Sequence, residues 1–345
     1  MSPSPRTAQA VTGAPAPKSR PSSAEHVVFG AGAVGLAIAD ALLARGVAPG
    51  QVRVVNRSGH APLPAGVQTL GGDASDPDFA VHAAAGARVV YQVLNAPYHR
   101  WAEDFPALQD GVIAAAAAAG ARLVTLENVY AYGAPQAGPD GRTKPFTEDS
   151  PLAAHTRKGA VRARMHADLM AAHAAGRVEV TVGRASDYFG PRGAAQAVNL
   201  GDQAMRAALT GRPAQVLGDP DQPHTYSYIP DIAAGLAILG EHPDAPGKVW
   251  HLPNDPRTRT TRQLLDLAYQ AAGHPRARLQ RVPVLALRAF GLFKPGARET
   301  IEMLYEFDRP FVVDSFRITA LGARHTPLER AIEATLAACR QGEAS

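Results

Sequence analysis

A glycine-rich loop near the start of the chain carries the clearest chemical signal. A short apolar strand precedes Gly30, Gly32 and Gly35, whose spacing is G-x-G-x-x-G, and an apolar helix follows them. In this pattern Gly30 permits a tight turn, Gly32 lets a pyrophosphate approach the backbone, and Gly35 lets the helix pack on the strand. The first helical amides, including those of Ala33 and Val34, then face the phosphates. The loop predicts a dinucleotide site; a purely structural turn is the alternative.

Two cations lie four residues apart on a helix expected over 157–175, namely Lys158 and Arg162. Helical spacing places them on one stripe with Met165 and Leu169, which predicts that both cations face inward. Like charges at this spacing repel by a few tenths of a kcal/mol, and an anion opposite them would offset that cost. We expect Arg162 to contact the ribose of the dinucleotide; a solvated first turn is the alternative.

Strands and helices alternate over the first half of the chain. Apolar runs predict strands at 26–30, 51–56, 66–70, 87–94, 121–126 and 177–183, and helices at 33–45, 76–85, 102–119 and 157–175. Short, continuously apolar strands between helices are typical of a parallel sheet covered on both faces. The fold class is therefore expected to be α/β, a doubly wound parallel sheet of the Rossmann type.

The pattern becomes less regular after residue 190, where strands expected at 214–218, 224–229, 248–252 and 278–282 mix with helices. We interpret residues 25–190 as a dinucleotide-binding domain. Residues 191–345 are expected to be mainly a smaller C-terminal α/β substrate lobe, with some segments returning to the first domain. Residues 1–24 are rich in Pro, Ser and Ala and are expected to form a disordered N-terminal extension.

The composition limits the classes of partner. The chain has 345 residues and a formal net charge of +4 with His neutral, which gives no case for a nucleic-acid or membrane partner. Cys339 is the only cysteine, so no intramolecular disulfide forms. The histidines lack metal-ligand spacing, and no metal is expected. No secretory signal or long apolar run is present, so we expect a cytoplasmic protein.

The end of the second strand indicates which dinucleotide binds. That strand ends in Asn56-Arg57-Ser58 without the carboxylate that would bind the ribose 2′-hydroxyl of NAD. Arg57 can fork onto a 2′-phosphate, which favours NADP; if Arg57 only lies on the surface, NAD stays open. Asp73, after the third strand, is placed to meet the adenine amino group or to serve as a plain turn residue.

An aromatic loop follows the fourth strand, in Asn95-Ala96-Pro97-Tyr98-His99-Arg100-Trp101. In an open sheet this loop lies at the carboxyl edge, where Asn95 is expected beside the dinucleotide. Tyr98, His99 and Trp101 are candidates to line a pocket for a planar or apolar substrate. Packing of Trp101 on Phe105 is an equally good explanation.

The order of further motifs resembles the short-chain dehydrogenase/reductase superfamily, and more narrowly its extended type, the NAD-dependent epimerase/dehydratase family. The resemblance covers nearly all of residues 26–340. It rests on Leu123–Leu126 followed by Tyr132-Gly133, on Phe146–Leu152, on Asp187-Tyr188-Phe189-Gly190-Pro191 and on Tyr226–Ala233. It implies a nicotinamide cofactor and a small-molecule substrate, with Tyr188 as a candidate substrate contact.

The chain departs from that family at the catalytic positions. The family uses a Ser or Thr after strand five and a Tyr-x-x-x-Lys pair on the next helix. This chain has Asn128 at the first position and Lys158-Gly159-Ala160-Val161-Arg162 at the second. The usual catalytic Tyr is absent, and the chain resembles the atypical members of the superfamily.

Several residues are candidates to replace the missing Tyr. Beside Arg162 and an oxidised nicotinamide, the pKa of Lys158 should fall, which would suit it to general acid or base catalysis. Tyr130 and Tyr132 are rival proton donors. Asn128 would orient the substrate oxygen, or else only cap the turn after the strand.

Two functions remain open at this point. One is an NAD(P)-dependent oxidoreductase or epimerase/dehydratase-like enzyme that transfers hydride between the nicotinamide and a carbonyl or alcohol carbon with a degenerate catalytic set. The other is a non-catalytic NAD(P)-binding sensor or regulator. By analogy with extended members of the superfamily, a homodimer through the helix at 157–175 is expected.

Overall fold

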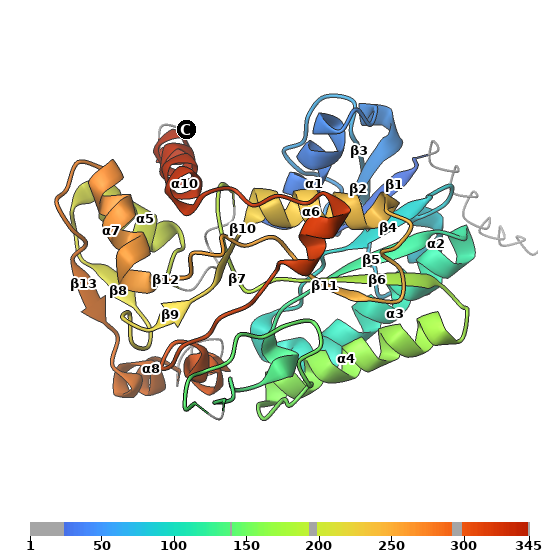
Figure 1. Cartoon of the computed structure of the whole chain (residues 1–345). Coiled ribbons are helices and arrows are strands. Elements are labelled where there is room, and N and C mark those ends of the chain that lie inside the picture. Colours follow the sequence, from blue (N-terminus) through green and yellow to red (C-terminus); the bar gives the residue numbers. More distant parts are fainter. Residues whose placement is uncertain (1–23, 139, 193–198, 292–298, 344–345) are drawn as a thin grey trace, which may run out of the picture.

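The computed structural model describes residues 24–138, 140–192, 199–291 and 299–343, and it consists of a layered α/β part and a smaller second lobe (Figure 1). The core of the first part is a seven-stranded sheet in the order β11-β6-β5-β4-β1-β2-β3, with all neighbours parallel. Its strands are β1 (His26–Phe29), β2 (Val52–Asn56), β3 (Gln68–Gly71), β4 (Val89–Gln92), β5 (Arg122–Glu127), β6 (Glu179–Arg184) and β11 (Val249–His251). The expected fold class is confirmed.

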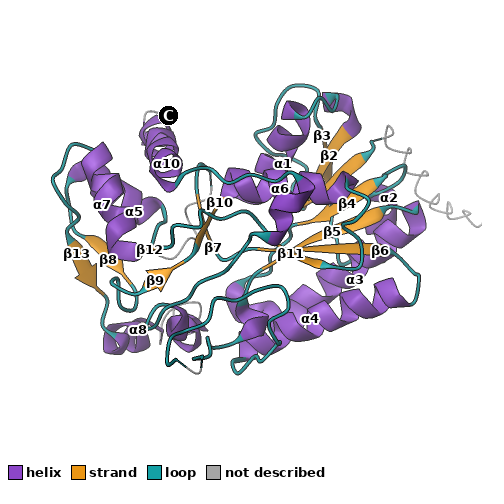
Figure 2. Ribbon diagram, in the orientation of Figure 1, coloured by secondary structure: helices purple, strands orange, loops and turns teal. Residues whose placement is uncertain are grey.

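Helices cover both faces of this sheet (Figure 2). One face packs on α1 (Ala33–Ala44) and α6 (Ile229–Glu241), and the other on α2 (Pro77–Ala83), α3 (Trp101–Ala119) and α4 (Arg157–Ala174). The strands are buried on both faces, which explains their continuous apolar runs. The chain crosses from one side of β1 to the other between β3 and β4, and the crevice at that switch point is where open α/β sheets bind ligands.

The glycine loop joins β1 to α1 as expected. Gly30 has φ +121°, and a Cβ there would lie 2.8 Å from the Val93 carbonyl oxygen. A Cβ on Gly35 would lie only 1.9 Å from the Gly30 carbonyl oxygen, so the start of α1 sits directly against the turn. A Cβ on Gly32 would meet nothing within 4 Å. Two of the glycines are therefore required by packing, and the third faces open space.

The helix α4 presents the stripe that its sequence predicted. Its buried residues are Lys158, Gly159, Arg162, Met165, Leu169 and Ala172. The helix begins at the cap Thr156, whose hydroxyl accepts from the Gly159 amide at 3.0 Å. The inward placement of both cations is confirmed.

The second lobe has a core of its own. It packs α5 (Asp202–Thr210), α7 (Thr261–Ala271) and α10 (Leu328–Glu343) around the short pair β8 (Ala214–Val216) and β13 (Leu279–Arg281). Cys339 is buried in that core. The pairs β7 (Asp187–Phe189) with β10 (Tyr226–Tyr228), and β9 (Pro223–His224) with β12 (Arg259–Thr260), lie between the lobe and the sheet (Figure 1).

The remaining elements are one α-helix and several short 3₁₀ segments. They are α8 (Val284–Gly291) and the 3₁₀ turns η1 (Pro49–Gln51), η2 (Tyr98–Arg100), η3 (Tyr130–Tyr132), η5 (Ile301–Glu306) and η6 (Arg317–Leu321). None of the helices in the described ranges combines the length and the hydropathy that crossing a membrane requires.

The structure places three of the expected segments more precisely. The strand expected at 248–252 is the edge strand β11 of the main sheet, to which the chain returns after α6. The strand expected at 224–229 is two strands, β9 and β10, since the Thr225 amide between them donates to Phe311. Ala24, assigned to the N-terminal extension, is fully buried in the core. Residues 1–23 lie outside the described residues, so the expected disorder stays a prediction.

The glycine loop gives a matched pair of variants. Gly35→Ala should lower the free energy of unfolding by roughly 1 to 3 kcal/mol, since its Cβ overlaps a backbone carbonyl that has little room to move. Gly32→Ala should cost less than about 1 kcal/mol, because its Cβ enters open space and only the cap preference of the helix changes. Urea unfolding of both variants measures the difference, and equal losses would contradict this packing.

Candidate functional site

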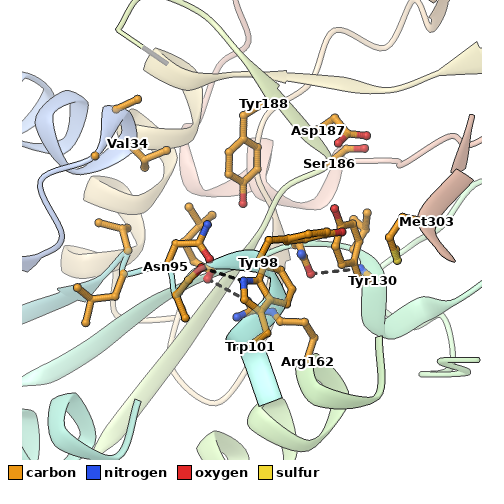
Figure 3. A pocket seen from close by; sticks show the side chains of 18 of the residues that line it. Val34, Asn95, Tyr98, Trp101, Tyr130, Arg162, Ser186, Asp187, Tyr188 and Met303 are labelled. Atoms are coloured by element: carbon orange, nitrogen blue, oxygen red, sulfur yellow. Dashed lines mark hydrogen bonds between the residues drawn. The ribbon is translucent and has the colours of Figure 1, made fainter. Parts of the chain in front are cut away.

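A cavity of about 650 Å³ lies at the carboxyl edge of the sheet, between the sheet and the second lobe. Figure 3 shows Val34 and Asn95 toward one end and Tyr130, Asp187 and Met303 toward the other. The cavity therefore runs from the glycine loop to residues of the second lobe. Its position is the switch point at which the fold favours ligand binding.

The first end of the cavity has the features of a dinucleotide cradle. Gly32, Ala33 and Val34, at the N-terminus of α1, line it together with Asn95, which follows β4. The cap Gly32 has no side chain to satisfy the first amides of α1, and the space above it is open. A pyrophosphate can accept from those amides and gain from the helix dipole. The residues present fit a nicotinamide dinucleotide.

Three residues expected at the adenine ribose lie outside the cavity itself. Asn56 ends β2 and its side chain closes the next turn, donating to the His60 carbonyl at 2.8 Å and accepting from the Gly59 amide at 2.7 Å. Arg57 is exposed beside it. Asp73 accepts from the amide and hydroxyl of Ser75, and these hydrogen bonds hold its pKa below the usual range. Asp73 can serve as a plain turn residue or contact the adenine amino group, and both roles stay predictions.

Arg162 reaches the cavity wall from α4 with part of its donor capacity unused. Its side chain is 5% exposed, and its guanidinium lies 5.0 Å from the centre of the Phe105 ring. One terminal nitrogen donates to the Leu126 carbonyl at 3.2 Å, while Nε has no partner among the described residues. Burial lowers its pKa and the Glu127 charge opposes that shift. A buried N–H without a partner is costly, and a ligand oxygen would satisfy it.

Lys158 has a different environment from the one expected. Its Nζ lies 2.6 Å from Glu299 and 4.3 Å from the centre of the Tyr98 ring, and the residue is not on the cavity wall. Glu299 lies in the segment before η5, 141 positions after Lys158, and this segment brings its carboxylate to α4. The ion pair holds the ammonium off the cavity wall, so the structure does not support Lys158 as the general acid or base.

The two candidate tyrosines of η3 point to opposite sides. Tyr130 lines the cavity and packs in the same cluster as Tyr98 and Trp101. Tyr132 is not on the cavity wall; its hydroxyl lies 2.6 Å from His251 Nε2 and its ring stacks on Phe146. Of the two proposed donors, only Tyr130 can reach a ligand in the cavity.

Asn128 lies on the cavity wall and also caps its turn. Its side-chain oxygen accepts from the Tyr130 amide at 3.3 Å. This hydrogen bond fixes the side chain and leaves the amide nitrogen for a ligand oxygen. The two roles considered for Asn128 are compatible.

Some residues of the aromatic loop after β4 line the cavity, and others do not. Tyr98 and Trp101 line the cavity, as does Tyr188 from β7, whereas His99 is exposed and lies off the wall. The Trp101 ring also packs edge-on against Phe105 at 5.3 Å between centroids, and its indole nitrogen donates to the Ala96 carbonyl at 3.1 Å. Trp101 is therefore both a packing residue and part of the wall.

Sequence reasoning missed two acidic residues on the wall at the second end of the cavity, Asp187 and Glu306. Asp187 stands in one of the motifs quoted above, but nothing in that motif marked it as facing a ligand. Glu306 ends η5, in a stretch without a recognisable pattern. Within the described residues, no group of His, Cys, Asp and Glu has the arrangement of a metal site.

Comparisons with known proteins agree with this geometry. Residues 27–252 match the model of the NAD dependent epimerase/dehydratase family, and the chain belongs to that family. The expected resemblance is confirmed. A comparison with curated proteins finds no match.

Solved structures of similar fold include three sugar-nucleotide enzymes. The dTDP-glucose 4,6-dehydratase of Streptomyces venezuelae, with NAD and TYD bound, has a TM-score of 0.72 and 18% identity over 92% of this chain and 98% of its own. UDP-glucuronic acid 4-epimerase from Bacillus cereus, in complex with NAD, has a TM-score of 0.70 and 15% identity over 92% of this chain and 98% of its own. UDP-glucose 4-epimerase of Thermotoga maritima, with UDP-glucose, has a TM-score of 0.72 and 16% identity over 92% of this chain and 99% of its own. These similarities show a shared fold.

The placement of Lys158 predicts a structural role. Lys158→Met should lower the free energy of unfolding by roughly 1.5 to 3 kcal/mol, because it leaves Glu299 without its charged partner. Cofactor affinity should stay within about twofold, since Lys158 is not on the cavity wall. Urea unfolding and calorimetric titration measure the two effects. The neighbouring exposed Arg157→Met is the matched control; a large loss of cofactor affinity in Lys158→Met alone would contradict this role.

Proposed function

We propose that the protein is an NAD(P)-dependent enzyme that transfers hydride between the nicotinamide and a carbonyl or alcohol carbon of a small molecule, with catalytic residues that differ from the usual set. The proposal rests on one observation: the N-terminus of α1 lines the same cavity as Asn128, Tyr130 and Arg162. Such a cavity brings a dinucleotide and a second ligand into contact. Membership in the epimerase/dehydratase family supports it.

Each residue of the cavity has a role in this proposal. The amides after Gly32 bind the pyrophosphate, and Arg162 donates from its unpartnered Nε to the nicotinamide ribose. Asn128 directs its amide nitrogen at the reacting oxygen of the substrate. The bound nicotinamide would supply and accept the hydride. The aromatic side chains exclude water from the reacting carbon.

The substrate is proposed to be a small molecule with a carbonyl or hydroxyl group. Tyr98, Trp101 and Tyr188 give the middle of the cavity flat apolar walls with hydroxyl groups at their edges. Such walls suit a sugar ring or another flat, oxygen-rich molecule. The structures of similar fold hold sugar nucleotides such as UDP-glucose, which supports this class without selecting a member.

For the cofactor we propose NADP. Arg57 is exposed at the end of β2, and neither Asn56 nor Ser58 offers a carboxylate to the ribose 2′-hydroxyl. Similar structures hold NAD, so the preference for NADP rests on Arg57 alone. A homodimer that pairs through α4 stays a prediction.

A sensor or regulator that binds NAD(P) without turnover is the second candidate. One observation favours it: the position of the family's catalytic Tyr is occupied by Lys158, which the structure holds in an ion pair. Both candidates predict cofactor binding. Only the enzyme predicts that the bound cofactor is oxidised or reduced by a substrate.

The test of the proposed function is a titration followed by a substrate screen. Purified protein is titrated calorimetrically with NADPH and NADH, and the complex is mixed with carbonyl compounds, including UDP-sugars, while the nicotinamide absorbance is followed. Binding with substrate-dependent oxidation supports the enzyme. Binding without turnover favours the sensor, and failure of both nucleotides to bind contradicts both.

Arg57 provides the test of cofactor choice. Arg57→Ala should raise the dissociation constant of NADPH by about tenfold or more, because a charge-assisted hydrogen bond to the 2′-phosphate is lost, and should leave that of NADH nearly unchanged. The exposed Arg177 precedes β6, which lies on the other side of β1 from β2 in the sheet, and gives the control Arg177→Ala. Equal weakening of the two nucleotides by Arg57→Ala would show that Arg57 does not select the cofactor.

A further inference from the structure

A buried carboxyl group without a partner lies on the wall of the cavity. Glu306, the last residue of η5, is 1% exposed, and its Oε1 makes no hydrogen bond among the described residues. The nearby groups on other elements are Asp187 of β7, Tyr98 of η2 and Tyr130 of η3, with Tyr305 beside it in sequence. None of these four groups is a cation, and His224 of β9 lies against the backbone carbonyl of Glu306 instead of its carboxyl group. An ionised carboxylate in this place would be strongly destabilising, whereas a protonated one is tolerated.

A second acidic group next to it is tied to a histidine. Asp187 Oδ2 lies 2.7 Å from Nε2 of His224, and Nδ1 of His224 lies 3.1 Å from the backbone carbonyl oxygen of Glu306. A carbonyl oxygen only accepts, so Nδ1 carries a proton. The contact with Asp187 then needs a further proton, on either Nε2 or the carboxyl group. The Asp187–His224 contact therefore already holds a proton of its own.

The charges around the cavity thus favour a neutral Glu306. Burial, followed by the charge of Asp187, raises the pKa of Glu306 well above the usual glutamate range. General acid–base groups work best when their pKa lies near the working pH, which burial achieves for carboxyl groups.

Tyr130 is a poorer proton source than Glu306. Burial of its hydroxyl raises its pKa well above that of a free tyrosine. Arg162, which stands where the family has its Lys, donates a hydrogen bond to the Leu126 carbonyl and not to the Tyr130 hydroxyl.

We propose that Glu306 is the proton-transfer residue of this cavity and that Asp187, held by His224, positions and polarises it; the inference rests on the proposed function. In the reducing direction a C–H bond forms at the carbonyl carbon with the hydride of the reduced nicotinamide, and the π electrons of the carbonyl move to its oxygen. The O–H bond of Glu306 breaks as a new O–H bond forms at that oxygen. The positive charge of the oxidised nicotinamide then stabilises the Glu306 carboxylate, and oxidation runs the steps in reverse.

The same electrostatics gives a test that needs no substrate. When NADP⁺ binds, the positive charge of its nicotinamide ring should favour ionisation of Glu306 and release up to about one proton, whereas NADPH, whose dihydronicotinamide ring is uncharged, should release less. The release is measured by titrating the full chain calorimetrically with each nucleotide in two buffers of different ionisation enthalpy. NAD⁺ and NADH replace them if they bind more tightly.

Two variants identify the group that releases the proton. Glu306→Gln should abolish the difference between the oxidised and reduced nucleotides and remove the infrared carbonyl band of a protonated carboxyl group at neutral pH. The matched control is Glu302→Gln on the same turn, whose carboxylate accepts from the Arg157 and Lys158 amides off the cavity wall and should leave both signals unchanged. Urea unfolding confirms that both variants are folded.

The outcomes separate this inference from the proposed function. Nucleotide binding without any proton release, or a release and a band that persist in Glu306→Gln, would overturn the role of Glu306 and leave cofactor binding intact. Failure of every nucleotide to bind the wild-type chain contradicts the proposed function, and the proton-transfer role falls with it. Once a substrate is found, Glu306→Gln should lower hydride transfer by about a hundredfold or more at unchanged cofactor affinity.

Discussion

A buried ion pair at the carboxyl ends of β5 and β6 holds the site together. Glu127 is 3% exposed, accepts from Arg184 at 2.6 Å and lies 3.2 Å from His166 of α4. Burial alone would raise the pKa of Glu127, but Arg184, His166 and Arg162 lower it to about 2. A buried carboxylate tolerates little displacement from its cations, so two strands and one helix share a fixed geometry. Asn128 follows this carboxylate directly, and Arg162 lies one turn before His166.

The chemistry of the cavity follows from where charges are compensated and where they are not. Lys158 and Glu127 are both buried and both paired, and neither is on the cavity wall. Arg162 and Glu306 are buried, lie on the wall and retain unpartnered atoms. An unsatisfied polar atom costs free energy, so a ligand that hydrogen-bonds the two atoms on the wall would be stabilised there. Our proposal assigns to Glu306, at the far end of the cavity, the proton transfer that the family's Tyr performs.

The sequence predicted what depends on local pattern. The glycine spacing predicted the turn before α1, and helical spacing predicted the inward face of α4, including Lys158 and Arg162. It failed where the partner lies far along the chain. The pairing of Lys158 with Glu299 and the approach of Glu306 to Asp187 depend on how η5 folds back over the sheet, and no periodicity encodes that contact. The sequence predicted the strand at 248–252 but not its place beside β6 in the main sheet, because its pairing partners lie 67 positions earlier.

A crystal structure grown with NADPH would test most directly whether this cavity is a dinucleotide site. We predict density for the pyrophosphate above Gly32, with the nicotinamide ribose within hydrogen-bond distance of Arg162 Nε and the nicotinamide ring in the part of the cavity lined by Asn128 and Glu306. A cavity that stays empty at saturating NADPH, or a nucleotide bound away from the glycine loop, would contradict it.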